Sequence, residues 1–105
     1  MDKLAIVLEV QAKDGKRDEI RAAWDRHLRP QLETPDSAQE LYLVCEDASD
    51  PDRLLLIEVY SDPSRMQANA GAPWFAEYMR EVGPLLDGQP RMMSGRPVWA
   101  KGIEV

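Results

Sequence analysis

The sequence predicts an α+β domain with a ferredoxin-like βαββααβ order and one antiparallel sheet. Three observations lead to this fold class. Apolar runs of strand length alternate with segments of helical periodicity, and a turn short enough for a hairpin joins two of these runs. The 105 residues also suffice for one hydrophobic core but not for two. We therefore expect residues 1–105 to form a single domain.

The first half of the chain predicts a strand, a helix and a second strand. Leu4–Ala12 is the first strand, and the Asp14-Gly15 turn ends it. From Lys16 the apolar residues follow a helical period. Pro30 must end or kink this helix, because proline lacks the backbone N–H and restricts the residue before it. The second strand is expected over Gln39–Asp47.

The second half predicts a strand, two helices and a last strand. Asp50-Pro51-Asp52 is a turn, so Arg53–Tyr60 should pair antiparallel with the strand before it. A short helix over Pro63–Ala70 begins at a proline, which suits the first helical turn. A longer helix is expected over Pro73–Leu86, and a final strand over Arg91–Ala100.

The first and third strands are apolar on both faces, which predicts a homodimer. In the first strand, Leu4, Ile6, Leu8 and Val10 alternate with Ala5 and Val7 rather than with polar residues. A sheet with one face in water shows a cleaner polar alternation. The chain has helices for only one face, so a second copy should cover the other. Trp99 and Ile103 are candidates to reach across to that partner.

Composition and charge exclude several partners. The net charge of −6, with basic residues scattered among acids, argues against nucleic acid, which binds clustered Lys and Arg. The short apolar run Leu4–Leu8 is too short for a membrane span or a signal sequence. The single Cys45 excludes an internal disulfide and suits a cytoplasmic protein. We expect a buried thiol there, since a nucleophile would need the only histidine, His27, beside it.

Several segments together resemble the antibiotic biosynthesis monooxygenase (ABM) domains. They are a turn with Gly15-Lys16, a hairpin with Asp50-Pro51 at its tip, the strand end Glu58-Val59-Tyr60, the helix start Pro73-Trp74-Phe75 and the helix end Pro84-Leu85-Leu86. The resemblance covers nearly the whole chain. It implies a dimeric α+β barrel of ferredoxin-like halves. Related barrels also house isomerases, haem-degrading enzymes and proteins without a known reaction.

Asn69 departs from the family pattern. Members similar to this chain often carry a histidine on the short helix, and haem-degrading relatives use it as the iron ligand. Asparagine is a poor ligand for haem iron, so we expect no haem. One histidine and one cysteine, far apart in the sequence, are too few for a transition-metal site, so no metal is expected either.

Three polar residues are candidates for catalysis. His27 lies on the apolar face of the first helix, which should aim it at the space between helix and sheet. There it either binds a backbone carbonyl or Glu58, or acts as a general base or hydrogen-bond donor in a pocket. Glu58 interrupts an apolar strand, where it is either paired with an arginine or acts as a proton acceptor with a raised pKa. Asn69 is either a helix-surface residue or, as the family position implies, an inward-facing donor to a substrate oxygen.

Four aromatic residues are candidates for substrate binding. Trp24, Tyr60, Trp74 and Phe75 either pack in the core or form the walls around a small aromatic ligand. Tyr42 and Tyr78 are expected to serve packing only.

No dinucleotide, flavin or phosphate-loop fingerprint is present, so we expect no cofactor. The resemblance then implies a cofactor-independent monooxygenase that oxidises a quinol or polyketide-like phenol with O₂. The alternative is a dimeric barrel of the same kind that binds a small ligand, or acts in stress, without catalysis. An isomerase or lyase on the same barrel is a third possibility.

Overall fold

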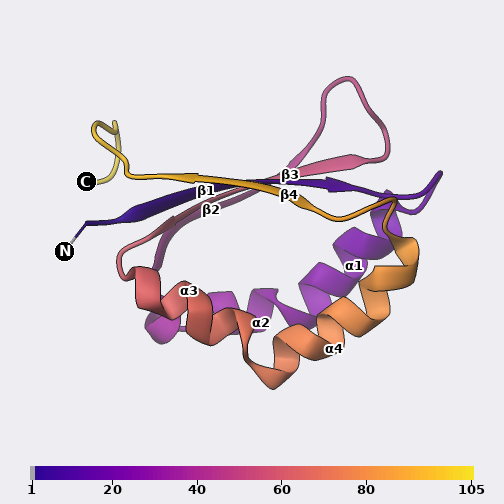
Figure 1. The fold of residues 1–105 in the computed structure, drawn as a ribbon, viewed down its shortest axis with the longest axis horizontal. Coiled ribbons are helices and arrows are strands. Elements are labelled where there is room, and N and C mark those ends of the chain that lie inside the picture. Colours follow the sequence, from indigo (N-terminus) through magenta and orange to yellow (C-terminus); the bar gives the residue numbers. More distant parts are fainter. Residues whose placement is uncertain (1) are drawn as a thin grey trace.

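The computed structural model of the chain describes residues 2–105 and has the predicted order of strands and helices. Four antiparallel strands form one sheet in the order β2-β3-β1-β4 (Figure 1). Their bounds are β1 (Leu4–Gln11), β2 (Gln39–Glu46), β3 (Arg53–Tyr60) and β4 (Arg91–Gly95). The predicted α+β, ferredoxin-like fold class is confirmed.

All helices lie on one face of this sheet, and the other face is open (Figure 1). The helices are α1 (Arg17–His27), α2 (Arg29–Leu32), α3 (Pro63–Ala70) and α4 (Pro73–Val82), with 3₁₀ turns η1 (Pro35–Ser37) and η2 (Gly83–Leu85). Among residues 2–105, no helix has the length and apolar character needed to cross a membrane.

Two predicted elements are too long at their C-terminal ends. The helix expected over 73–86 ends at Val82, because Pro84 cannot donate a helical hydrogen bond and its ring would clash with the preceding turn. The strand expected over 91–100 ends at Gly95, and Pro97 has no N–H with which to continue the ladder. The first two strands each end one residue earlier than predicted.

The hydrophobic core lies between the helices and the sheet. Ile20 and Ala23 of α1 and Val82 of α4 are almost completely buried, and they pack against Leu54 and Leu56 of β3. The strands point alternate side chains toward this layer, so every second residue of β1 and β3 enters the core. The same layer also encloses a cavity that is lined in part by core residues such as Leu56 and Val82, and this is where the candidate site lies.

The open face of the sheet is also apolar, as the sequence predicted. Leu43 pairs with Ile57, Ile57 with Val7, and Val7 with Met93, so the four side chains form one row across all four strands. Within this row Leu43 is 46% exposed, Met93 47% and Val7 38%. A single chain leaves this row in water, which is unfavourable for large apolar side chains.

The C-terminal segment after β4 lies beyond the sheet. Trp99 is 77% exposed and its neighbour Val98 is 80% exposed, whereas Ile103 is half-buried. The Lys3 ammonium binds the backbone carbonyl of Glu104 and so holds the end of the segment near the start of β1. That Trp99 and Ile103 contact a second copy stays a prediction.

Candidate functional site

A cavity of about 400 Å³ lies between the sheet and the helix layer. Its sheet side is formed by apolar residues such as Ile6 and Leu8 of β1 and Leu56 of β3. Its helix side is formed by Leu28, just after α1, and by residues of α2, α3 and α4 such as Met79. Most of the wall is therefore apolar, and this suits the body of a small organic ligand.

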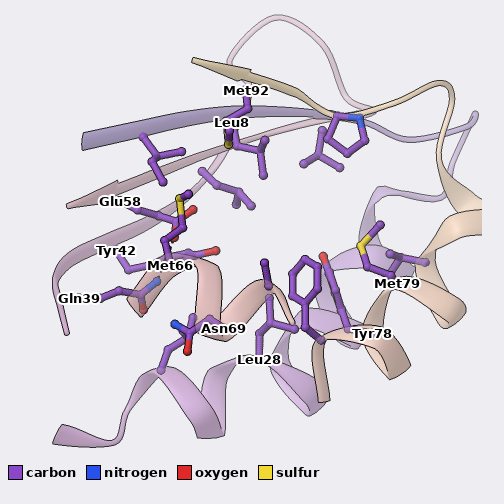
Figure 2. A pocket seen from close by; sticks show the side chains of 18 of the residues that line it. Leu8, Leu28, Gln39, Tyr42, Glu58, Met66, Asn69, Tyr78, Met79 and Met92 are labelled. Carbon is purple, nitrogen blue, oxygen red and sulfur yellow. Dashed lines mark hydrogen bonds between the residues drawn. The ribbon is translucent and has the colours of Figure 1, made fainter. Parts of the chain in front are cut away.

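The polar residues of the cavity gather at one end of it. Figure 2 shows Gln39, Tyr42, Glu58 and Asn69 near one another there, while Tyr78 and Met79 lie at the other end. Glu58 faces the cavity because it follows Leu54 and Leu56 on the helix-facing side of β3. Asn69 reaches the cavity from the last turn of α3. The site thus combines a large apolar part with a small polar end.

Glu58 is the buried carboxyl group of the site. It is only 8% exposed, and Gln39 Nε2 donates a hydrogen bond of 2.9 Å to its Oε1. Burial raises the pKa of Glu58, and hydrogen bonds from Tyr60 and Gln39 oppose this shift. None of the ion pairs found among residues 2–105 involves Glu58. The interpretation of Glu58 as an arginine partner is therefore wrong.

Tyr60 lies beside this carboxyl group. Gln39 Nε2 also donates a hydrogen bond of 2.7 Å to the Tyr60 hydroxyl. Burial and then the charge of Glu58 raise the pKa of Tyr60 to about 12, and hydrogen bonding from Asn69 and Gln39 opposes the rise. The Asn69 amide therefore lies close to the Tyr60 oxygen, but its Nδ2 makes no hydrogen bond of regular geometry and is shielded from solvent. Tyr60 stays a neutral phenol at physiological pH.

His27 does not line the cavity. It is the last residue of α1, and its Nε2 lies 3.5 Å from Glu81 Oε1 of α4. Its side chain is 24% exposed, and its ring packs edge-on to Tyr78. The expectation that His27 faces the space between helix and sheet is thus wrong, because the end of α1 turns it toward α4 instead. Glu58 and Asn69 meet at one site, and His27 does not join them.

Trp24 also lies outside the cavity wall. Its ring is 9% exposed in the core, and its Nε1 donates a hydrogen bond of 3.2 Å to the Tyr42 hydroxyl. The hydroxyl that it holds belongs to a residue that does line the cavity. Burial, followed by the charge of Glu58, raises the pKa of Tyr42. Trp24 therefore holds the cavity residue Tyr42 in place and does not itself line the cavity.

The other predicted aromatic residues do line the cavity. Tyr60, Trp74 and Phe75 all contribute to its wall, and Trp74 and Phe75 meet edge to face at 6.2 Å between ring centroids. Tyr42 and Tyr78, which the sequence suggested for packing only, are further wall residues. Burial raises the pKa of Tyr78 to about 12.

Cys45 lies on the open face of the sheet and not in the core. It pairs with Leu55, whose side chain faces away from the helices, and it is half-buried in the single chain. His27 lies in the helix layer on the opposite side, so the two residues cannot form a nucleophilic pair. Within residues 2–105, no cluster of three or more His, Cys, Asp or Glu residues is arranged to hold a metal ion.

Solved structures with this fold carry the name that the sequence resemblance suggested. No family model and no curated protein sequence matches the chain. A protein from Chloroflexus aurantiacus, named provisionally as an antibiotic biosynthesis monooxygenase, superposes with a TM-score of 0.79 at 22% identity, over 97% of this chain and 99% of its own. The chain has the ABM fold.

Two further structures with the same provisional name agree. The one from Nitrosomonas europaea has a TM-score of 0.83 at 14% identity, and the alignment covers 96% of this chain and 95% of that one. The one from Caulobacter crescentus has a TM-score of 0.84 at 14% identity, with 93% and 92% covered. At such identities the likeness concerns the fold, and the chemistry must be argued from the residues of this ABM-like chain.

The buried Glu58 predicts a pH-dependent stability. A carboxyl group whose pKa is raised in the folded state favours folding below its unfolded pKa, and this contribution is lost as pH rises through the folded pKa. We expect Glu58→Gln to be more stable than the wild type at pH 8, with a free energy of unfolding higher by about 1.4 kcal/mol per unit of pKa shift removed, and therefore to melt at a higher temperature. The gap should shrink toward pH 4. Thermal melts across this range check it, and a gap that does not change with pH would contradict it.

Proposed function

We propose that the chain is a cofactor-independent monooxygenase that binds a quinol or polyketide-like phenol in the cavity and oxidises it with O₂. The observation that carries the proposal is a single buried carboxyl group, Glu58, at the polar end of an otherwise apolar cavity. A volume of about 400 Å³ lies within the range of about 300–1,000 Å³ that small-molecule sites occupy. The raised pKa of Glu58 suits a general base for a phenol.

In the proposed reaction, Glu58 accepts the phenolic proton and the phenolate gives one electron to O₂. The resulting radical pair combines at a ring carbon to form a peroxide anion, which takes the proton back from Glu58 and becomes a hydroperoxide. Loss of water, which takes the hydrogen from that carbon, leaves a quinone. One oxygen atom enters the product and the other leaves as water, so all four electrons for O₂ come from the substrate. The apolar wall keeps bulk water from the phenolate and the radicals.

Asn69 is assigned as the donor to the phenolate oxygen. Asn69 lines the polar end of the cavity, and its Nδ2 makes no hydrogen bond of regular geometry. A donor already in place where negative charge develops stabilises that charge without reorganisation. Tyr60, Trp74 and Phe75 are assigned as walls that contact the ring.

Loss of the Asn69 donor should slow the reaction. We expect Asn69→Leu to lower kcat by about tenfold to 100-fold, the range for a lost hydrogen bond to a developing charge. Steady-state oxygen uptake measures this. Gln67→Leu, an exposed position on the same helix, is the matched control and should leave kcat unchanged. Equal effects of the two substitutions would show that the loss comes from α3 and not from the donor.

We further propose that the protein is a homodimer in which the open sheet faces of two copies pack against each other. The row of Leu43, Ile57, Val7 and Met93 is apolar and crosses the whole sheet. A two-fold axis through this row would pair the same patch on both copies. The arrangement would also bury Cys45, which a single chain leaves half-exposed.

A second candidate function is ligand binding without turnover. The observation that favours it is that His27 lies beside Glu81 and not at the cavity, so the histidine cannot take the proton on from Glu58. Oxygen uptake with a panel of phenols, hydroquinones and anthrones separates the two. The monooxygenase predicts uptake above the buffer rate and a quinone product. A ligand that stabilises the protein in thermal melts and is recovered unchanged would favour binding alone.

A further inference from the structure

The three tyrosines of the cavity wall differ in the hydrogen bonds of their hydroxyl groups. The Tyr42 hydroxyl accepts a hydrogen bond of 3.2 Å from Trp24 Nε1. The Tyr60 hydroxyl accepts one of 2.7 Å from Gln39 Nε2. The Tyr78 hydroxyl has no hydrogen-bond partner among residues 2–105, and burial is the sole cause of the raised pKa of Tyr78. Its hydrogen is therefore free to bind another molecule.

The Tyr78 oxygen is open to the cavity. Polar side-chain atoms that lack a partner and are also shielded from solvent include Gln39 Oε1 and Asn69 Nδ2, but the Tyr78 oxygen is not one of them. An unpaired oxygen outside this group is accessible. The residue as a whole is only 7% exposed and lines the cavity, so the accessible oxygen faces the cavity and not the outer surface. Figure 2 shows the Tyr78 side chain extending from α4 toward the sheet.

The Tyr78 ring is held in place by its neighbours. Phe75 lies three residues earlier on α4, a spacing that brings the two rings together, and their centroids lie 6.1 Å apart. The His27 ring packs edge-on against Tyr78 from the end of α1, at 6.5 Å between centroids. A ring packed between two others in a close-packed layer has little freedom to turn away. The hydroxyl is thus already positioned before a ligand binds.

Tyr78 and Glu58 lie at opposite ends of the cavity (Figure 2). The cavity wall that α4 forms around Tyr78 is otherwise apolar, with Phe75, Met79 and Val82 on the same helix. A ligand that covered the Tyr78 hydroxyl with carbon atoms would take its donor out of water and leave it without a partner. That is unfavourable, whereas an acceptor oxygen at the same place satisfies the hydroxyl.

We propose that the Tyr78 hydroxyl is a second recognition group, which donates a hydrogen bond to an acceptor oxygen at the end of the ligand remote from the reacting hydroxyl. This inference rests on the proposed function, in which the reacting hydroxyl faces Glu58. The ligand class is an aromatic ring system with a phenolic hydroxyl at one end and a carbonyl group at the other. A carbonyl oxygen suits the site because it only accepts hydrogen bonds and the Tyr78 hydrogen is free.

Two pairs of probes test the inference under argon, where no oxidation occurs. The two-ring pair is 6-acetyl-2-naphthol and 6-isopropenyl-2-naphthol, and the one-ring pair is 4′-hydroxyacetophenone and 4-isopropenylphenol. Within each pair the shape is nearly the same, but the isopropenyl compound has a CH₂ group in place of the carbonyl oxygen. The ketone also makes the phenol more acidic, so the quantity compared between proteins is the ratio of the two dissociation constants, called here the ketone preference.

Tyr78→Phe removes the proposed donor and keeps the ring. Calorimetry should show that it binds the ketone about tenfold more weakly than the wild type does, as expected for one lost hydrogen bond, and binds the isopropenyl compound equally well. The ketone preference should therefore fall by about tenfold in at least one pair. A preference that is the same in Tyr78→Phe and the wild type for both pairs would overturn the proposal.

Tyr60→Phe is the matched control, since it removes the same atom at the polar end of the cavity. It should keep the ketone preference of the wild type, whatever its effect on binding of both compounds. A preference that is lost in Tyr60→Phe and kept in Tyr78→Phe would place the carbonyl group at the polar end, and the proposed orientation of the ligand would be wrong.

Thermal melts without ligand check both the folding of the variants and the free hydroxyl. Tyr78→Phe should melt no lower than the wild type, because its hydroxyl has no partner to lose. Tyr60→Phe should melt lower, because Gln39 Nε2 loses an acceptor. A lower melting temperature of Tyr78→Phe would show that the hydroxyl is paired within the protein, which contradicts the proposal.

The outcome is independent of turnover. A ketone preference that depends on Tyr78, without oxygen uptake in air, would support this inference and contradict the monooxygenase. Oxygen uptake together with a preference that Tyr78→Phe leaves unchanged would support the monooxygenase and contradict this inference.

Discussion

Glu58→Gln should reduce kcat for oxidation of a phenolic substrate by at least about 100-fold, the lower end of what a positioned general base contributes. Glutamine can still accept the hydrogen bonds that Gln39 and Tyr60 donate to Glu58, so the cavity should keep its shape. Only the ability to take a proton is lost. Oxygen uptake under saturating substrate measures the effect.

Glu77→Gln is the matched control for this substitution. Glu77 lies at an exposed position of α4, where the substitution makes the same chemical change. The kcat of Glu77→Gln should equal that of the wild type. Binding of the substrate under argon should change little in Glu58→Gln. Full activity of Glu58→Gln would show that another group takes the proton, and the assignment of Glu58 would be wrong.

The dependence of kcat on pH shows whether Glu58 is the group whose ionisation activity requires. Glu58 must be ionised to act as a base, so kcat should rise with pH through its folded pKa, which burial places above the ordinary value of 4.5. The residual activity of Glu58→Gln should lack this rise. The same shift makes the wild type less stable as pH rises. The charge needed for activity therefore works against folding, as is common at active sites.

Leu43→Glu should separate the proposed dimer into monomers. Leu43 lies in the row of apolar side chains that crosses the open face. A two-fold interface contains this row from both copies, so the substitution places two glutamates in the interface. Burying two unpaired carboxylates should weaken association by at least about 100-fold. Sedimentation velocity across a range of concentrations measures the shift, and the monomer should stay folded because the core lies on the other face.

Ala76→Glu is the control for charge alone. It lies on the exposed side of α4, in the helix layer, so this variant should remain a dimer. A wild type that sediments as a stable, folded monomer would contradict the proposed interface, and the open face would then need another explanation.

The sequence was sufficient for the fold because the apolar periodicity is regular. Alternation in β1 and β3 gave both the sheet and its two apolar faces. The same alternation identified Glu58, since a carboxyl group among Leu54 and Leu56 must face the core. Errors arose at helix and strand ends, where Pro84 and Pro97 decide the boundary locally.

The site was less predictable, because it depends on contacts between distant segments. His27 shares the apolar face of α1, yet the partner that holds it, Glu81, belongs to α4 and has no local signal in the sequence. Gln39 was missed because simple alternation gives it the wrong face. A register shift at the start of β2 reverses it, and this shift follows from the turn at Ala38 and its hydrogen bonds to Ser61. The one available clue was a glutamine at the start of a strand whose centre is apolar.

Oxidation under ¹⁸O₂ shows whether the oxygen atom that enters the product comes from O₂. The protein is first dialysed against a strong chelator and freed of small molecules, and is then given a dihydroxylated aromatic substrate. We expect a quinone that carries one ¹⁸O atom per molecule, with the other ¹⁸O atom in water, and a rate that Glu58→Gln lowers. An unlabelled product, or activity that disappears with the chelator and returns with a metal ion, would contradict it.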